Sequence, residues 1–121
     1  MKKLPMASDA GKRTRNAVAV ELLAMENGRF KVEGELTFAS VPEMLKISAR
    51  LFQGQSSIHL DLSGVGRADS AGLALLIGWR AQAGREKRAL DFYAIPEQIL
   101  AMARVNGVES MLAPSATNNQ I

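Results

Sequence analysis

The sequence contains no cysteine and only one histidine, His59. Without cysteine there can be no disulfide, no thiol nucleophile and no thiolate metal ligand. A single histidine also makes a histidine-based metal site or a histidine-activated nucleophile unexpected. Long apolar runs are missing as well, since the longest, residues 71–79, falls far short of the roughly 20 residues that span a bilayer. The sequence therefore predicts no metal, no cofactor and no membrane-spanning segment.

The 121 residues are 47% hydrophobic and 22% charged, which is typical of one soluble domain. Residues 1–17 hold five basic residues and one acidic residue, a net charge of +4, whereas the whole chain carries +3. The domain proper is thus slightly acidic, and the basic character belongs to the N-terminal tail. We expect this tail to be solvated; contact with anionic lipid headgroups is a weaker alternative. Nucleic acid is not expected, because the tail lacks aromatic residues and the domain lacks a basic face.

The apolar spacing predicts alternating strands and helices. An Asn27-Gly28 turn joins the first two strands, and Pro42 begins the first helix. The expected elements are strands near 18–22 and 30–36, a helix at 42–52, a strand at 58–62, a helix at 70–83, a strand at 90–94, a helix at 96–103, and a short strand or turn at 108–112. This order predicts an α/β fold with a mixed, mainly parallel sheet and helices largely on one face.

The expected domain covers residues 18–112, between a flexible basic tail at 1–17 and a flexible C-terminal tail at 113–121. A secretory signal peptide needs an apolar stretch after its basic start, and the N-terminal residues supply more charge instead. We therefore expect a cytoplasmic protein.

Ser70 is the most conspicuous polar residue, because it should lie where a strand turns into a helix, beside Asp69. One interpretation is that Asp69 or Ser70 simply caps the helix. The functional interpretation is that the Ser70 hydroxyl accepts a phosphate, which the helix N-terminus would stabilise, or contacts a partner protein. Nearby glycines, including Gly72, keep the surroundings uncrowded.

Catalytic motifs are not found around this turn. The pair Gly64 and Gly66 lacks the third glycine of a dinucleotide loop, and the residues around Ser70 do not form the Gly-x-Ser-x-Gly motif of a nucleophile elbow. Asp61 and Asp69 lie on different elements, so they do not form a carboxylate pair, and His59 fits a structural role within a strand. We predict that the protein is not an enzyme.

The helix after Ser70 carries apolar residues around a wider arc than contact with one sheet requires. Either the helix is unusually buried in its own domain, or part of it docks on a partner, which we favour. Two surfaces remain possible for such docking. One contains Leu75 and Trp79, and the other is the small-residue stripe of Ala74, Gly78 and Ala81.

Three segments resemble a STAS domain, as found in sulfate transporters and anti-sigma factor antagonists. They are Gly34-Glu35-Leu36, His59-Leu60-Asp61-Leu62-Ser63 and Ala68-Asp69-Ser70-Ala71-Gly72-Leu73, and the resemblance spans roughly residues 18–112. It implies a sheet flanked by helices and a protein-binding role. In the antagonists, a partner kinase phosphorylates the serine that matches Ser70. Thr37 departs from the family pattern, because an acidic residue often follows Gly-Glu-Leu.

Within the family, the run from Ala71 to Leu76 looks most like the STAS subunit of the Mla-type phospholipid ABC transporter. This resemblance implies a cytoplasmic subunit that binds the ATPase and, through it, the inner-membrane permease complex that maintains outer-membrane lipid asymmetry. The membrane would be contacted only indirectly. The alternative is an anti-sigma factor antagonist whose binding to an anti-sigma kinase is switched by phosphorylation of Ser70.

Both hypotheses place the partner at the start of the 70–83 helix and the loops beside it. The residues expected to bind the partner or accept the phosphate are Asp69, Ser70, Ala71 and Gly72. Those expected to contact the partner only are Phe38, Val41, Leu73, Ala74, Leu75, Gly78, Trp79 and Pro96.

Overall fold

The structure, a computed structural model, describes residues 20–114. Val18, the predicted N-terminal tail and residues 115–121 lie outside the described residues. Within them the elements are β2 (Val20–Ala24), β3 (Arg29–Leu36), α2 (Val41–Leu51), β4 (Ser57–Ala68), α3 (Ser70–Arg85), β5 (Ala89–Tyr93), α4 (Glu97–Val105) and the 3-10 helix η1 (Glu109–Leu112). The predicted order of strands and helices is confirmed. In the 108–112 segment, where a short strand or turn was expected, residues 109–112 form the 3-10 helix η1.

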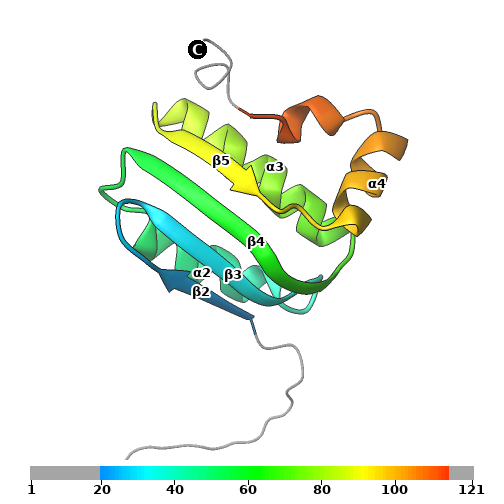
Figure 1. Ribbon diagram of the computed structural model, residues 1–121, viewed down its shortest axis with the longest axis horizontal. Coiled ribbons are helices and arrows are strands. Elements are labelled where there is room, and N and C mark those ends of the chain that lie inside the picture. Colours follow the sequence, from blue (N-terminus) through cyan, green and yellow to red (C-terminus); the bar gives the residue numbers. More distant parts are fainter. Residues whose placement is uncertain (1–19, 115–121) are drawn as a thin grey trace, which may run out of the picture.

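The four strands form one mixed sheet in the order β2-β3-β4-β5. Strand β2 runs antiparallel to β3, whereas β3 pairs parallel with β4 and β4 parallel with β5. Helices α2 and α3 lie together behind the sheet in Figure 1, and the opposite face of the sheet is not covered by a described helix. The predicted mixed sheet with helices largely on one face is confirmed.

The Asn27-Gly28 turn forms the predicted hairpin between β2 and β3. Both residues have positive φ, 60° for Asn27 and 74° for Gly28, which is the backbone conformation of the turn that suits two twisted strands. Arg29 N donates to Glu26 O at 3.2 Å and closes the turn. This geometry sets the antiparallel register, in which Val32 lies opposite Leu22.

The core lies between the sheet and the helices. Alternate residues of each strand point toward the helices, as their period of two requires. Fully buried side chains include Ile58, Leu60 and Leu62 of β4, Val32 of β3, and Leu76 of α3. Each such side chain contributes about 1.5–3 kcal/mol when it leaves water. None of the described helices has both the length and the apolar character needed to cross a bilayer.

Strand β4 is longer than predicted, since it continues six residues beyond Leu62 to Ala68. Two register shifts against β3 let it bend while it stays paired. Residues 64–68, which were expected in a turn, therefore belong to the strand. The connection to α3 shrinks to Asp69, and α3 itself extends two residues further, to Arg85.

Candidate functional site

Asp69 ties the end of β4, the start of α3 and the loop after β3 into one unit. Its backbone N–H donates to Leu36 O at 3.1 Å. Its carboxylate accepts from the backbone N–H of Ala71 at 2.8 Å, as a helix N-cap, and from that of Phe38 at 3.2 Å. The capping interpretation is thus correct for Asp69. The same carboxylate also holds the neighbouring loop in place.

Ser70 is the first residue of α3 and is exposed. Because Asp69 caps the helix, the Ser70 hydroxyl is not needed for capping, and it forms no hydrogen bond with another residue between 20 and 114. The dipole of α3 places partial positive charge at this end of the helix, which favours a negative charge on Ser70. Ser70 is therefore available to a partner protein or to a phosphate.

The loop after β3 is held by Ser40, which is buried. Its hydroxyl accepts from Thr37 N at 2.9 Å and donates to Glu35 O at 2.5 Å. Thr37 is buried as well, with 7% of its surface exposed. Phe38 is 74% exposed, the largest value among the big aromatic side chains of the described residues. The loop therefore presents an aromatic ring to solvent next to Ser70.

An apolar groove of about 550 Å³ lies between this loop, α2 and the N-terminal half of α3. Its lining has one polar side chain, that of Ser70. We call it the α2–α3 groove; it is lined by Phe38, Val41, Pro42, Leu45, Ser70, Ala71, Ala74, Leu75 and Gly78. Seven of the residues expected at a partner surface thus come together at one place.

Three residues that were expected at the partner surface, Gly72, Leu73 and Trp79, do not line the α2–α3 groove. All three are buried inside the domain. A side chain on Gly72 would come within 2.7 Å of Leu36 O, so this glycine lets α3 pack closely on β3. The Trp79 indole donates to Ser48 Oγ at 3.0 Å and lies 5.6 Å from the Phe52 ring.

Two further expectations are refined. Leu75 is 4% exposed and forms the floor of the groove, while the small residues Ala74 and Gly78 of α3 are exposed beside it. Of the two possible docking surfaces on this helix, the structure thus exposes the small-residue stripe. Pro96 precedes α4 and is not among the groove residues.

Sequence reasoning missed Pro42 and Leu45, which line the groove from α2. Leu45 is 50% exposed, because the buried side of α2 is formed by Met44 and Ser48. The signal was present in the sequence. Apolar residues at 41, 42 and 45 make the apolar arc of α2 wider than packing on the sheet requires.

The uncovered sheet face carries a second polar group of residues around His59. The His59 ring contacts Ser57 Oγ at 3.0 Å and Tyr93 OH at 3.2 Å, so both ring nitrogens have partners. Asp61 accepts from Ser63 N at 2.9 Å, and this backbone hydrogen bond lowers the pKa of Asp61. These contacts fit the structural role predicted for His59. No group of His, Asp or Glu residues between 20 and 114 is arranged to hold a metal ion.

Comparison with known families identifies the fold. A family model described as the STAS domain of Mlab matches residues 22–113. The chain belongs to the STAS domain family. This confirms the resemblance inferred from the motifs. The match covers every described helix and strand apart from the first two residues of β2.

Relatives within the STAS family include anti-sigma factor antagonists. The anti-sigma-B factor antagonist of Staphylococcus epidermidis is 28% identical over 83 residues, which cover 68% of this chain and 77% of that protein. SpoIIAA in its unphosphorylated form, an anti-sigma factor antagonist, aligns with a TM-score of 0.56 and 21% identity over 79% of this chain and 84% of that one. The phosphorylated form of the Bacillus cell fate determinant SpoIIAA gives a TM-score of 0.59 and 19% identity over 80% and 91%. At such identities the two structures show a shared fold.

Proposed function

We propose that this STAS domain is a non-catalytic subunit that docks on a protein partner through the α2–α3 groove, and that the partner is the ATPase of an Mla-type phospholipid ABC transporter. The observation that carries the docking proposal is the groove itself. It joins an exposed aromatic ring, a floor of buried leucine and an unpartnered hydroxyl. Exposed apolar surface of this kind, with a polar group at its edge, is typical of protein interfaces.

The chemistry of the groove favours docking over catalysis. Ser70 has no histidine within reach that could act as a base, since His59 is held on the opposite face of the sheet by Ser57 and Tyr93. Asp69 stands beside Ser70, but both of its carboxylate oxygens accept backbone N–H groups. A carboxylate engaged in this way orients the backbone and does not activate a nucleophile.

The choice of an ABC transporter ATPase as the partner rests on the family model. Its description names the STAS domain of Mlab, and it matches nearly the whole described domain. The small-residue stripe of α3 suits this role, because Ala74 and Gly78 allow a partner helix to approach the backbone closely. In this role the subunit would lie in the cytoplasm, attached to the inner membrane only through the ATPase and permease.

A second function is supported by Ser70 and by the relatives. The exposed hydroxyl at the N-terminus of α3 is well placed to carry a phosphate, and relatives bear the name anti-sigma factor antagonist. A phosphate would add a charge of about −1.5 to −2 to a groove that has no other charged lining. Burying that charge against an apolar partner surface would cost desolvation free energy and weaken binding, so the same groove could serve as a phosphorylation switch.

Affinity purification of the full chain from its own cells, followed by mass spectrometry, distinguishes the two functions. Recovery of an ABC ATPase with unmodified Ser70 supports the transporter subunit. Recovery of a kinase-like anti-sigma factor, with phosphate on Ser70, supports the switch and contradicts the transporter role. The docking surface is tested separately with Ser70→Glu, which should abolish recovery of the partner.

The matched control for that substitution is Ser56→Glu. Ser56 is also exposed, but it precedes β4 at the opposite end of the strand from Ser70. It introduces the same charge outside the groove, so partner recovery should stay at the wild-type level. Equal recovery with Ser70→Glu and wild type would refute the proposed interface.

A further inference from the structure

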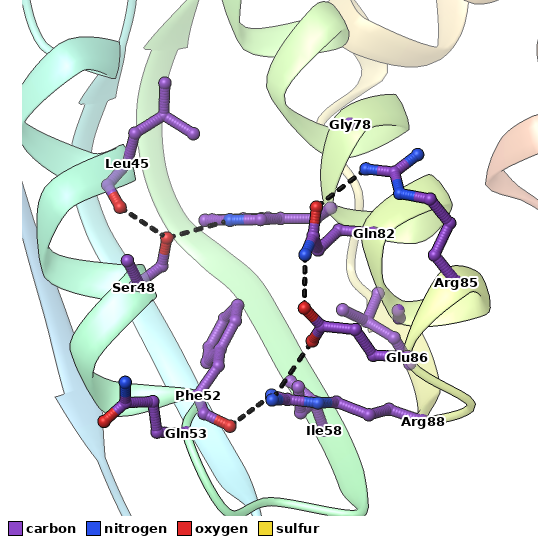
Figure 2. A pocket seen from close by; sticks show the side chains of 14 residues that line it. Leu45, Ser48, Phe52, Gln53, Ile58, Gly78, Gln82, Arg85, Glu86 and Arg88 are labelled. Atoms are coloured by element: carbon purple, nitrogen blue, oxygen red, sulfur yellow. Dashed lines mark hydrogen bonds and ion pairs between the residues drawn. The ribbon is translucent and has the colours of Figure 1, made fainter.

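A second cavity, which we call the distal cleft, continues the α2–α3 groove toward the C-terminal ends of both helices. Its volume is about 630 Å³, and Leu45 and Gly78 line both cavities. Figure 2 shows Ser48 of α2 on one side, followed by Phe52 and Gln53 just after the helix. On the other side it shows Gln82 and Arg85 of α3, followed by Glu86. The size falls within the range of about 300–1,000 Å³ that is usual for small-molecule sites.

The floor of the distal cleft is apolar and aromatic. It is formed by Phe52, Ile58 and Trp79, all buried. The polar atom of the indole is already satisfied, because Trp79 Nε1 donates to Ser48 Oγ at 3.0 Å. A ligand on this floor needs no hydrogen-bonding groups of its own. A peptide would leave its backbone N–H and C=O groups unpaired there, which is costly, whereas an alkyl chain would not.

The mouth of the distal cleft is polar, and its side chains are connected to one another (Figure 2). Arg85 Nη2 donates to Gln82 Oε1 at 2.7 Å, and Gln82 Nε2 donates to Glu86. Glu86 also pairs with Arg88 at 3.1 Å, and Arg88 donates to the Phe52 carbonyl at the end of α2. The carboxylate of Glu86 is therefore occupied by two donors from the protein.

The charge that remains at the mouth is positive. Among the residues that line the cleft, two arginines, Arg85 and Arg88, stand against one carboxylate, that of Glu86. The C-termini of α2 and α3 carry partial negative charge, which basic residues in their last turns, Arg50 and Arg85, offset. Arg85 uses one of its five N–H groups within the protein and is exposed, so the others can bind an anion.

We propose that the distal cleft binds a single-chain anionic amphiphile, with the alkyl chain on the floor and the carboxylate or phosphate at Arg85. This ligand satisfies both ends of the site at once, since an apolar chain matches the Phe52–Trp79 floor and an anionic head matches the basic mouth. The site is separate from Ser70, but it shares Leu45 and Gly78 with the docking groove.

Trp79 provides a direct probe, because it is the only tryptophan in the chain and lines the cleft. The full chain is titrated with dibrominated stearate below its micellar concentration, since bromine quenches tryptophan fluorescence only at close contact. We expect saturable quenching. A brominated alkyltrimethylammonium of the same chain length should bind at least about tenfold more weakly, because its head carries the wrong charge. Equal binding of the two probes would overturn the proposal.

Two variants test the two ends of the site. Arg85→Gln should weaken stearate binding by about tenfold, as expected for the loss of a charge-assisted hydrogen bond. Lys46→Gln, an equal charge change on α2 outside the cleft, should leave it unchanged. Ala49→Leu should weaken binding by filling the cleft, and a melting curve verifies that this variant is folded. Binding that neither Arg85→Gln nor Ala49→Leu weakens would refute the site.

Displacement of the brominated probe distinguishes the sources of the anionic head. Unlabelled palmitate that displaces it better than lysophosphatidylglycerol would identify a free fatty acid. The reverse order would identify a single-chain phospholipid. Both results support the proposal, whereas displacement by neither compound, or quenching without saturation, contradicts it.

Discussion

The Asp69 carboxylate accepts the backbone N–H of Phe38 at 3.2 Å across the gap between two loops that are 31 residues apart in the chain. With its other oxygen it caps α3 through Ala71 N at 2.8 Å. One side chain thus sets the position of the exposed Phe38 ring relative to Ser70. The two adjacent residues therefore have different roles. Asp69 positions the loop and the helix, and the Ser70 hydroxyl remains available for binding.

This division predicts different effects for two adjacent substitutions. Asp69→Ala should lower the free energy of unfolding by about 1–3 kcal/mol, because it removes a helix cap and a loop anchor. Ser70→Ala should change it by less than about 0.5 kcal/mol, since the hydroxyl has no partner within residues 20–114. Urea denaturation measures both. A larger loss for Ser70→Ala than for Asp69→Ala would contradict the assigned roles.

Two glycines of α3, the buried Gly72 and the exposed Gly78, predict effects of opposite sign. A Cβ on Gly78 would meet no atom within 4 Å, so Gly78→Ala should stabilise the protein by about 0.5–1 kcal/mol through helix propensity. A Cβ on Gly72 would lie 2.7 Å from Leu36 O, and Gly72→Ala should destabilise it by about 1–3 kcal/mol through overpacking. Thermal unfolding of both variants measures these effects. A change of the melting temperature in the same direction for both would contradict the packing of α3 described above.

Much of the fold and part of the site could be predicted from the sequence. The Asn27-Gly28 turn, Pro42 and the alternation of apolar residues are local signals, and they set the element order. The length of β4 could not be read in this way, because Gly64 and Gly66 are typical of turns. Pairing with β3 and the bulges keep them in the strand, which is a tertiary effect.

The assignment of α3 residues failed for a related reason. Leu73 and Trp79 were expected at a partner surface because the apolar arc of α3 is wider than one sheet contact needs. The structure shows what else they contact. Trp79 packs against Phe52 and bonds to Ser48 on α2, so α3 is buried on a second side by a neighbouring helix. A helical wheel describes one helix and contains no information about such a neighbour.

The Trp79–Ser48 contact predicts a coupled pair of substitutions. Ser48→Ala leaves the indole N–H buried without its acceptor and should cost about 1–3 kcal/mol of unfolding free energy. In a Trp79→Phe background that N–H is absent, so adding Ser48→Ala should cost much less. A double-mutant cycle by urea denaturation measures the coupling, which should exceed about 0.5 kcal/mol. Strictly additive costs would mean that the hydrogen bond contributes nothing to stability.

The lowered pKa of Asp61 predicts that the stability of the protein depends on pH in the acidic range. The Ser63 backbone hydrogen bond, followed by the Ser63 hydroxyl and by Lys31 and Arg29, lowers the pKa of Asp61 below its ordinary value of 3.8. A carboxylate with a lowered pKa in the folded state stabilises the protein above the pKa of the unfolded state, and this contribution is lost as the pH falls through the folded-state value. Asp61→Asn keeps an oxygen that can accept from Ser63 N but removes the charge.

The variant should therefore be less stable than wild type near neutral pH, and the difference in unfolding free energy should shrink as the pH falls below 3.8. Because Asp61 is only half-buried, solvent screens its charge, so the difference is small at every pH and is reduced by salt. Urea denaturation of both proteins across this acidic range, at low and high salt, measures it. A difference that grows on acidification would mean that the carboxylate is destabilising in the folded state, and would remove Ser63 as its stabilising partner.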